Sequence, residues 1–317
     1  MVAMRIAVVG AGGVGGFFGA RLAAAGDEVT FVARGRHLEA IRADGLTVRS
    51  PLGDLRVSPD SVVPSIADVP AADVVLVAVK LWDTEDVAKQ LRPLAEGGAA
   101  VVSLQNGVQK DDVLRAHLPE ESVMGGVCYI SAFIEEPGVV RHNGSLAKLV
   151  FGEFGAHGAE PSRRAGALLD RCAAAGIDAE VSAAVERVIW EKFVFLVGLS
   201  GTTSAVRQPI GVVRGTPGSR ALLRDVMREA AAVGRGRGVD LDAGLADERL
   251  AFCDTLPADM TSSMHTDLKH GNRHELPWLS GAVADLGREL GVPTPRNQAV
   301  ADVLAPYVLG TPGAGDE

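Results

Sequence analysis

The sequence predicts an α/β protein with an N-terminal Rossmann-like, doubly wound parallel sheet and an all-helical C-terminal domain. In the first half, short β-rich runs alternate with helical patterns, and several runs are continuously apolar. Strands buried on both faces of a parallel sheet have this composition. After about Val181, long helical patterns dominate and β-rich runs are few. We therefore expect two domains, 1–182 and 183–317.

Each element is expected from its local pattern. The predicted strands are Arg5–Val9, Val29–Val32, Val74–Val79, Ala99–Leu104 and Val123–Val127. The predicted helices are Gly13–Ala25, Arg36–Ala43, Thr84–Leu91, Val185–Leu199, Arg220–Val233, Thr261–Lys269 and Leu279–Leu290. Gly26 is expected to cap the first helix at its C-terminus, and Asp83 to cap the third at its N-terminus.

Length and composition limit the class of protein. The 317 residues are 47% hydrophobic and 22% charged, with a net charge of −9. This is the composition of an ordinary soluble protein of about two domains. The acidic balance argues against nucleic acid or an anionic membrane as the main partner.

Two further features predict a cytoplasmic location. The three cysteines lie far apart and form no CxxC pair, which is typical of a reducing compartment. The apolar start, Met4–Val9, is too short for a signal-peptide core, and no run approaches the roughly 20 apolar residues of a membrane-spanning helix. We expect a soluble, cytoplasmic protein.

A glycine-rich turn gives the strongest indication of function. A GxGxxG pattern follows the first predicted strand directly and opens a helix; its residues are Gly10, Ala11, Gly12, Gly13, Val14 and Gly15. Gly10 permits a tight turn, Gly12 lets a pyrophosphate approach the backbone, and Gly15 lets the helix pack close to the sheet. The N-terminus of the helix offers unpaired N–H groups to the phosphates. The turn therefore predicts dinucleotide binding.

The end of the second predicted strand indicates which dinucleotide. An NAD site usually has an acidic residue there to hold the ribose 2′-hydroxyl. Here the chain reads Val32-Ala33-Arg34, with no acid. A guanidinium suits a 2′-phosphate by charge and by bidentate geometry, so we expect NADPH or NADP⁺. The alternative is that Arg34 is only a solvated loop cation.

Polar residues also follow two other predicted strands of the first half. Lys80 follows Val74–Val79, and Asn106-Gly107 follows the run that ends at Leu104. The carboxyl ends of the strands line the ligand crevice of a doubly wound sheet, which favours a functional role. Alternatively, Lys80 extends along apolar surface into water, and Asn106-Gly107 is an ordinary turn.

Taken in order, these pieces and others downstream resemble the ketopantoate reductase (2-dehydropantoate 2-reductase) family. The matching pieces are Gly10–Gly15, Ala33-Arg34, Val79-Lys80, Asn106-Gly107, Trp190-Glu191-Lys192, Ser263 with Glu275, and Gly291-Val292-Pro293. They span nearly the whole chain. The resemblance implies a Rossmann domain, a helical domain and an active site in the cleft between them. It also implies that NADPH delivers a hydride to the keto carbon of a 2-oxo acid in pantothenate biosynthesis, and by analogy a homodimer.

The resemblance also implies roles for individual residues. Lys192 would donate a proton to the forming alkoxide, Glu275 would position a substrate hydroxyl, and Ser263 would contact the substrate carboxylate. An ammonium suits the charge that develops on the carbonyl oxygen during hydride transfer. Glu275 precedes Pro277, which can begin a helix whose dipole favours a carboxylate. The alternative for Lys192 is a surface lysine beside Glu191.

The remaining implied roles concern the nucleotide. Arg34, Lys80 and Asn106 correspond to cofactor contacts, and Lys80 and Asn106 also lie near the reacting centre in the family. Asn106 is therefore expected to contact the substrate as well.

The chain departs from the family where substrate is expected to bind. The family pattern commonly has asparagines four and eight residues after the lysine and a third downstream, where this chain has Leu196, Ser200 and Ile210. Positions i, i+4 and i+8 share one face of a helix. An apolar site discriminates hydroxyl groups poorly, so the preferred 2-oxo acid is hypothesised to be more apolar than ketopantoate. Thr202 and Thr203 are candidates to compensate for the lost amides.

Two other motifs have simpler explanations. His265, His270 and His274 are close in sequence, but Gly271 interrupts any helix between them and no HExxH motif is present, so no metal is expected. The run Gly234–Gly238 contains two arginines and is explained as the glycine-rich end of a helix rather than an RNA contact.

Three functions remain open from the sequence. The leading hypothesis is NADPH-dependent reduction of 2-dehydropantoate to (R)-pantoate. The second is a family member that reduces another 2-oxo acid or carbonyl compound. The third, from a different class, is a non-catalytic NADP(H)-binding sensor, which would not need Lys192 and Glu275.

Overall fold

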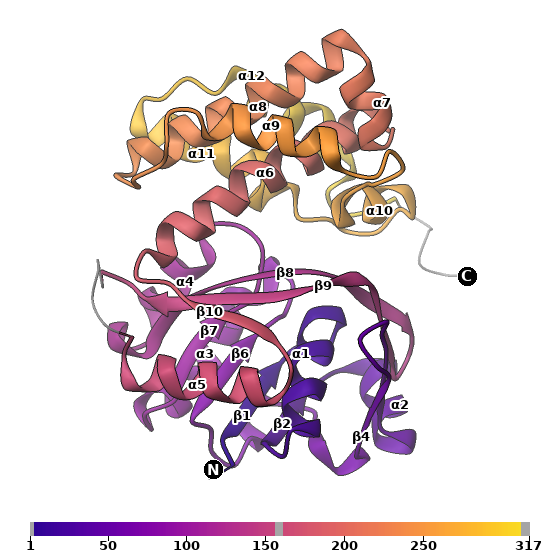
Figure 1. Ribbon diagram of the computed structural model, residues 1–317, viewed down its shortest axis with the longest axis vertical. Helices are drawn as coiled ribbons and strands as arrows, with labels where there is room; N and C mark the ends of the chain where they lie inside the picture. Colours follow the sequence, from indigo (N-terminus) through magenta and orange to yellow (C-terminus); the bar gives the residue numbers. More distant parts are fainter. Residues whose placement is uncertain (1–2, 156–160, 312–317) are drawn as a thin grey trace. The chain divides into compact units, whose positions relative to one another are not determined.

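The chain forms two compact units in its computed structural model, which describes residues 3–155 and 161–311 (Figure 1). Unit 1 comprises Met1–Asn106 and Lys110–Val188, and unit 2 comprises Gly107–Gln109 and Ile189–Glu317. The boundary expected from the sequence, between residues 182 and 183, lies just before helix α6, Val185–Val206.

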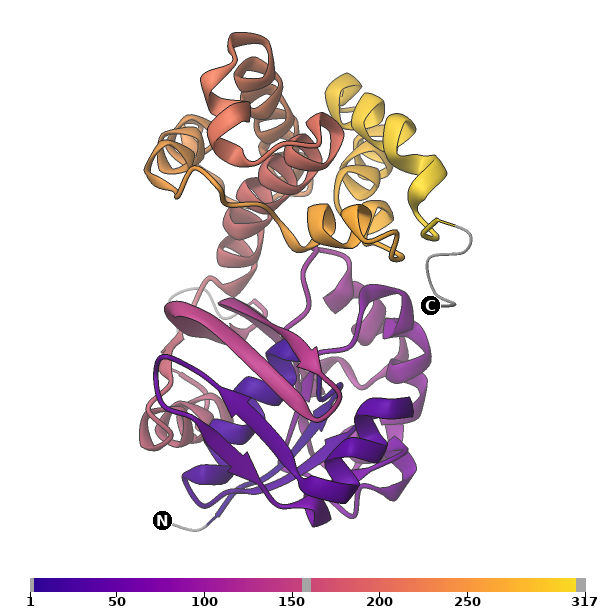
Figure 2. The same ribbon diagram turned by 90° about the vertical axis from the view of Figure 1, so that its right-hand side faces the viewer.

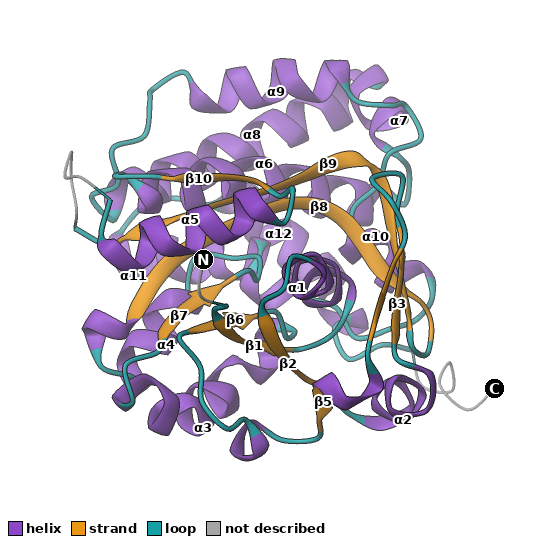
Figure 3. Ribbon diagram, turned by 60° about the horizontal axis from the view of Figure 1, so that its bottom comes forward, coloured by secondary structure: helices purple, strands orange, loops and turns teal. Residues whose placement is uncertain are grey.

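Unit 1 is built on one large sheet whose strand order is β4-β3-β9-β8-β7-β6-β1-β2-β5, with β10 also paired to β9 (Figure 3). The strands are β1 Arg5–Val9, β2 Glu28–Val32, β3 Leu46–Arg49, β4 Leu55–Val57, β5 Val62–Val63, β6 Val74–Val77, β7 Ala100–Ser103, β8 Val123–Glu136, β9 Val139–Glu153 and β10 Asp178–Val181. The run from β8 through β7, β6, β1 and β2 to β5 is parallel. The predicted doubly wound parallel sheet is therefore confirmed.

The sheet differs from the prediction at one side, where it becomes mixed. β8 continues well past the predicted end at Val127 and turns back at Gly138, whose φ is +80°, into the antiparallel strand β9. β3 pairs parallel to β9, and β4 pairs antiparallel to β3. β9 and the shorter strands β3, β4, β5 and β10 were not predicted. These strands alternate buried and exposed residues or are very short, so they lack the continuous apolar pattern of the parallel core.

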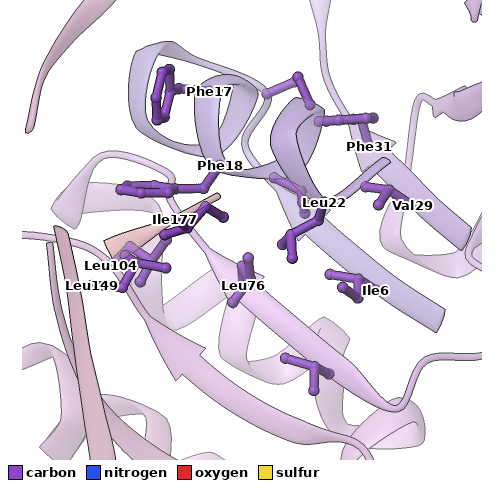
Figure 4. Packing of buried hydrophobic residues seen from close by; sticks show 14 of the residues in the cluster. Ile6, Phe17, Phe18, Leu22, Val29, Phe31, Leu76, Leu104, Leu149 and Ile177 are labelled. Carbon is purple, nitrogen blue, oxygen red and sulfur yellow. The ribbon is translucent and has the colours of Figure 1, made fainter. Parts of the chain in front are cut away.

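Helices cover both faces of the parallel strands. α1 (Gly13–Ala24), α2 (Gly35–Asp44) and α5 (Arg163–Ala174) belong to one apolar core, whereas α3 (Thr84–Glu96) and α4 (Lys110–His117) belong to the other. Alternate residues of β1 enter the two cores: Ile6 and Val8 face α1, and Ala7 and Val9 face α3. Phe17, Phe18 and Leu22 bring α1 onto the first core, as Figure 4 shows. This two-faced burial holds the carboxyl ends of the strands in fixed positions.

The described residues of unit 2 form helices joined by loops and no strand, which confirms the predicted all-helical C-terminal region (Figure 2). Its helices are α6, α7 Ile210–Gly215, α8 Pro217–Gly236, α9 Leu245–Thr255, α10 Ser263–Lys269, α11 Ser280–Leu290 and α12 Pro295–Leu304. α6 and α8 pack closely where Gly234 of α8 meets the Trp190 ring of α6: a Cβ on Gly234 would lie only 2.7 Å from that ring. α7, α9 and α12 were not predicted. No described helix has an apolar stretch long enough to span a bilayer.

Helix ends follow the predicted signals with one correction. α1 ends at Ala24 and Gly26 follows with a φ of +91°, and the glycine-rich run 234–238 does end α8. Asp83 occupies the N-cap position of α3 but makes no side-chain capping bond, since its carboxylate binds Arg34 instead. The capping role predicted for the Asp83 side chain was therefore wrong.

All three cysteines, Cys128, Cys172 and Cys253, are buried and unpaired as thiols. Burial raises the pKa of Cys172 and of Cys253 to about 12.

Candidate functional site

The glycine-rich turn joins β1 to α1 and has one open side. Gly10 has a φ of +101°, and a Cβ there would lie 2.9 Å from the Ala78 backbone. A Cβ on Gly15 would lie 2.2 Å from the carbonyl oxygen of Gly10, so α1 starts in close contact with the turn. A Cβ on Gly12, by contrast, would meet nothing within 4 Å. Gly12 is therefore the point at which a ligand can approach this backbone.

The next glycine of the turn is covered by the β8–β9 hairpin. A Cβ on Gly13 would lie 2.2 Å from the carbonyl oxygen of Ala132 and 2.6 Å from the nitrogen of Phe133. Farther along α1, a Cβ on Gly16 would lie 2.9 Å from the Val140 side chain of β9. The hairpin thus packs on the first turn of α1, where two glycines make room for it.

His37 of α2 contacts both the glycine-rich turn and this hairpin. Its Nε2 lies 2.8 Å from the carbonyl oxygen of Ala11, and its Nδ1 accepts a hydrogen bond of 3.0 Å from the Gly138 N–H. Burial lowers the pKa of the half-buried His37 ring, and the hydrogen bond to Ala11 opposes this shift. Sequence analysis missed His37, because one histidine in a short helix gives no signal.

Arg34 and Lys80 lie beyond the carboxyl ends of β2 and β6, the two neighbours of β1. The Arg34 side chain is 80% exposed, and its Nη2 donates a hydrogen bond of 2.6 Å to Asp83 Oδ2. The Nζ of Lys80 lies 5.7 Å from the centroid of the Trp82 ring. Arg34, Lys80 and the glycine-rich turn thus follow the carboxyl ends of three neighbouring strands, β2, β6 and β1.

A buried hydrogen-bond network fixes the backbone beside Lys80 and Asn106. Gln105 Nε2 donates to the carbonyl oxygen of Val79 at 3.0 Å and to Thr84 Oγ1 at 2.8 Å. Gln105 and Thr84 are buried, and Asn106 is partly exposed. The network joins the ends of β6 and β7, so it holds the residues that follow each strand at a set separation.

A buried ion pair adds to this network on the side of α4. The ammonium of Lys110 donates to the carbonyl oxygens of Ser103 (3.3 Å) and Gly126 (3.0 Å) and to Asp111 Oδ2 (2.9 Å). Burial raises the pKa of Asp111, and the charge of Lys110 opposes this shift. Sequence analysis missed the pair, because neighbouring residues of opposite charge are usually solvated.

In unit 2, α6 carries the residues expected to act on substrate. Lys192, Leu196 and Ser200 share one face of this helix. Lys192 and Leu196 are partly exposed, whereas Ser200 is buried with 1% exposure. Ile210, at the start of α7, is fully buried.

Thr202 and Thr203 do not replace the missing amides. Both are fully buried, and their hydroxyls donate to the carbonyl oxygens of Gly198 (2.7 Å) and Leu199 (2.6 Å) one turn earlier in α6. The compensation that we considered from the sequence is therefore wrong, because these hydroxyl protons are used within the helix.

Ser263 begins α10, and Glu275 follows this helix in the chain. Ser263 is the exposed first residue of that helix, whose N-cap is Ser262, and Glu275 is buried with 8% exposure. The Nδ1 of His265 donates to the carbonyl oxygen of Thr203 at 2.9 Å, which ties the start of α10 to α6. Glu275 is the N-cap of one 3-10 turn, Leu276–Trp278, which contains Pro277, and α11 follows from Ser280. A single turn has a smaller dipole than a full helix, so the helix-dipole effect on Glu275 stays a prediction of smaller size.

His274 is buried in unit 2 with 0% exposure, and neither ring nitrogen has a hydrogen-bond partner within the described residues. Burial lowers the pKa of His274; Asp267 opposes this shift and Arg207 adds to it. Within residues 3–155 and 161–311, no three His, Cys, Asp or Glu side chains gather in an arrangement that could hold a metal ion.

Comparison with known proteins identifies the family. The family model "Ketopantoate reductase PanE/ApbA" matches residues 6–156, and its C-terminal counterpart matches residues 184–308. The chain belongs to the ketopantoate reductase family. This confirms the resemblance seen in the sequence, and it makes the chain an NAD(P)-dependent oxidoreductase.

Relatives of known sequence or structure cover almost the whole chain. The 2-dehydropantoate 2-reductase of Halobacterium salinarum is 34% identical over 95% of this chain and 98% of its own length. An uncharacterized oxidoreductase of Bacillus subtilis, YkpB, is 30% identical over 96% and 99%. The crystal structure of a family ketopantoate reductase from Ralstonia eutropha matches with a TM-score of 0.86 and 33% identity, over 96% of this chain and 98% of that one.

The fold is shared with an enzyme of another name. A structure of D-mandelate dehydrogenase with NADH and anilino(oxo)acetate matches with a TM-score of 0.85 at 22% identity, over 96% of this chain and 98% of that one. Family membership therefore establishes an oxidoreductase, and the residues of this chain must indicate the substrate.

Proposed function

We propose that the protein reduces a 2-oxo acid to a 2-hydroxy acid with NADPH, and that its substrate is 2-dehydropantoate, giving (R)-pantoate. The observation that carries the nucleotide part of the proposal is the exposed Arg34 guanidinium, paired with Asp83 beyond the carboxyl end of β2, where the open backbone of Gly12 follows the carboxyl end of the neighbouring β1. A guanidinium in this position suits the 2′-phosphate that distinguishes NADPH from NADH.

Unit 1 supplies the residues that hold the nucleotide. The N–H groups at the start of α1 bind the pyrophosphate, and Arg34 binds the 2′-phosphate. Lys80 and Asn106 follow strands whose ends are fixed by Gln105, so they contact the nucleotide from set positions. NADPH supplies the hydride when it is bound.

Unit 2 supplies the residues that act on the oxo acid. The ammonium of Lys192 stabilises the charge that develops on the carbonyl oxygen and gives it a proton, so that a hydride and a proton add across the C=O bond. Ser263 hydrogen-bonds the substrate carboxylate. Glu275 accepts a hydrogen bond from the substrate hydroxyl.

Replacing Lys192 tests the reaction. We expect Lys192→Ala to lower kcat by roughly 100-fold or more, since a positioned acid contributes about that much, while the Kd for NADPH stays the same. NADPH absorbance reports turnover with 2-dehydropantoate, and nucleotide fluorescence reports binding. Lys269→Ala, at the exposed end of α10, is the matched control. Equal turnover of the two variants would remove Lys192 from the reaction.

A second candidate substrate is a more apolar 2-oxo acid. Leu196, one turn after Lys192, presents a hydrocarbon side chain, and Thr202 and Thr203 provide no free hydroxyl proton. Comparing kcat/KM for 2-dehydropantoate with that for the 2-oxo acid of mandelate decides between the two. We expect Leu196→Asn to move the ratio toward 2-dehydropantoate, whose hydroxyl an amide can hydrogen-bond.

A role in pantothenate biosynthesis, a cytoplasmic location and a homodimer remain predictions. The proposed substrate supports the first, and light scattering of the purified protein tests the third.

A further inference from the structure

We propose that His37 is a positioning residue for the nucleotide-binding turn, and that it fixes the direction of the Gly12 N–H that meets the pyrophosphate. The proposal rests on the proposed function, because it assumes that the turn binds a dinucleotide. It adds a residue of α2 that does not touch the ligand itself.

The two hydrogen bonds of His37 define its tautomer. The Gly138 N–H can only donate, so Nδ1 of His37 must accept and carries no proton. The proton of the neutral ring therefore lies on Nε2, which donates to the carbonyl oxygen of Ala11 at 2.8 Å. Burial lowers the pKa of His37, in agreement with a neutral ring.

The bond to Ala11 sets the orientation of the peptide that ends at Gly12. In a planar trans peptide, the C=O of one residue and the N–H of the next point in opposite directions. When His37 holds the Ala11 carbonyl on one side, the Gly12 N–H must point to the other. Rotation of this peptide would break the bond to His37 and turn the Gly12 N–H away.

The groups on either side of this peptide are already held by backbone bonds. The Ala11 N–H donates to the carbonyl oxygen of Val32 at 3.2 Å, and the Gly12 carbonyl oxygen accepts from the Gly16 N–H at 2.7 Å. The Ala11 carbonyl is held by a side chain instead. His37 therefore completes the set of bonds that define the turn.

The other ring nitrogen connects the turn to the β8–β9 hairpin. Gly138 lies at the hairpin's own turn, and the backbone of Ala132 packs against Gly13. The hairpin therefore contacts this region at two points, Ala132 against Gly13 and Gly138 against His37. His37 cannot shift without losing one of its two hydrogen bonds. This arrangement explains why a histidine is used here, since its two ring nitrogens face different partners.

Two conservative variants of His37 each keep one of its two hydrogen bonds. The Gln side chain places its amide where Nε2 lies and can still donate to Ala11, whereas the shorter Asn places its oxygen where Nδ1 lies and can still accept from Gly138. We expect His37→Asn to raise the Kd for NADPH roughly tenfold and His37→Gln to raise it less than about threefold. His117→Gln, in α4, is the matched control and should bind as the wild type does.

The comparison of NADPH with NADH tests how His37 acts. Both nucleotides carry the same pyrophosphate, so His37→Asn should weaken both by the same factor and leave kcat at saturating nucleotide unchanged. Disruption of α2 would instead move Arg34 and weaken NADPH selectively. Selective loss of NADPH, equal binding by all variants, or better binding by His37→Asn than by His37→Gln would each overturn the proposal. If wild-type protein binds neither nucleotide, the proposed function itself fails, which is a different result.

Discussion

The glycine-rich turn of unit 1 and the surroundings of α6 in unit 2 differ in how their polar groups are hydrogen-bonded. In unit 1, both ring nitrogens of His37 are hydrogen-bonded, and the amide of Gln105 has two acceptors. In unit 2, His274 is fully buried with no partner for either ring nitrogen among the described residues, and the buried hydroxyls of Ser200 and Ser280 likewise have none there.

This difference has an energetic meaning. A buried polar group without a hydrogen bond costs about 1–3 kcal/mol, whereas a satisfied network makes one backbone arrangement much better than its alternatives. The turn in unit 1 is therefore held in one arrangement by hydrogen bonds within unit 1 itself. Unit 2 has apolar packing such as that of Trp190 on Gly234, and three of its buried polar side chains, His274, Ser200 and Ser280, have no hydrogen-bond partner among the described residues.

The largest expected effect is on the free energy of unfolding, and it differs between two neighbouring glycines of the turn. Gly13→Ala would place a Cβ 2.2 Å from the β8 backbone, so we expect the free energy of unfolding to fall by about 3 kcal/mol. Gly12→Ala meets open space at a φ of −71° and should change stability by less than about 1 kcal/mol, yet weaken NADPH binding. Urea unfolding and nucleotide titration of both variants check this; equal stability losses would contradict it.

The next effect concerns the 2′-phosphate. Arg34→Ala removes a charge-assisted contact worth about 1.5–3 kcal/mol, so we expect the Kd for NADPH to rise about tenfold or more and that for NADH to change little. Titration with each nucleotide measures this, with Arg36→Ala, at an exposed position of α2, the helix whose N-cap is Arg34, as the control. A parallel loss for both nucleotides would place Arg34 elsewhere in the site.

In unit 2, a substitution is expected to raise the stability of the protein, by a smaller amount. His274→Leu replaces a buried, unpartnered ring with an apolar side chain of similar size, so we expect the protein to gain about 1 kcal/mol of stability at neutral pH. His37→Leu should lose stability, because it leaves the Ala11 carbonyl and the Gly138 N–H without their partner. Denaturation of the two variants under one condition sharpens the comparison, and a loss in both would contradict it.

The smallest effect is a dependence on pH. Burial lowers the pKa of both His37 and His274 below their ordinary value of 6.5. The unfolded chain then binds protons more readily than the folded one, so their contribution to stability is complete above about pH 6.5 and declines as the pH falls toward the folded-state pKa. We expect His274→Leu to lose less stability than wild type between neutral and mildly acidic pH. Parallel curves would show that His274 does not titrate differently in the two states.

The sequence predicted unit 1 best where one local pattern carries both structure and function. β1 was predicted at its observed bounds, Arg5–Val9, and the turn after it has the expected geometry at Gly10 and Gly15, because glycines, strand and helix are adjacent in the chain. The β8–β9 hairpin and the link from His37 to Gly138 were missed. The hairpin joins neighbouring strands, but much of it alternates buried and exposed residues and so lacks the continuous apolar pattern of the parallel core. The link from His37 to Gly138 joins distant segments, which no local pattern encodes.

In unit 2 the sequence predicted helices better than their details. α8 and α11 have one apolar face, and α6 is a long, largely apolar run, so these helices were predicted; the single 3-10 turn after Glu275 has no such pattern. The use of the Thr202 and Thr203 hydroxyls within α6 depends on burial, which a sequence does not display. The resemblance to the family supplied Lys192 as a candidate, whereas its residue type alone would have suggested a surface position.

The buried thiols offer a practical advantage for spectroscopy. Cys128, Cys172 and Cys253 are all buried, and burial raises the pKa of Cys172 and of Cys253 to about 12, so a negligible fraction of the latter two is thiolate at neutral pH. A single cysteine introduced at an exposed position would then react with a maleimide dye well ahead of the native ones. Fluorescent reporters can accordingly be attached to either unit without first removing any natural sulfur.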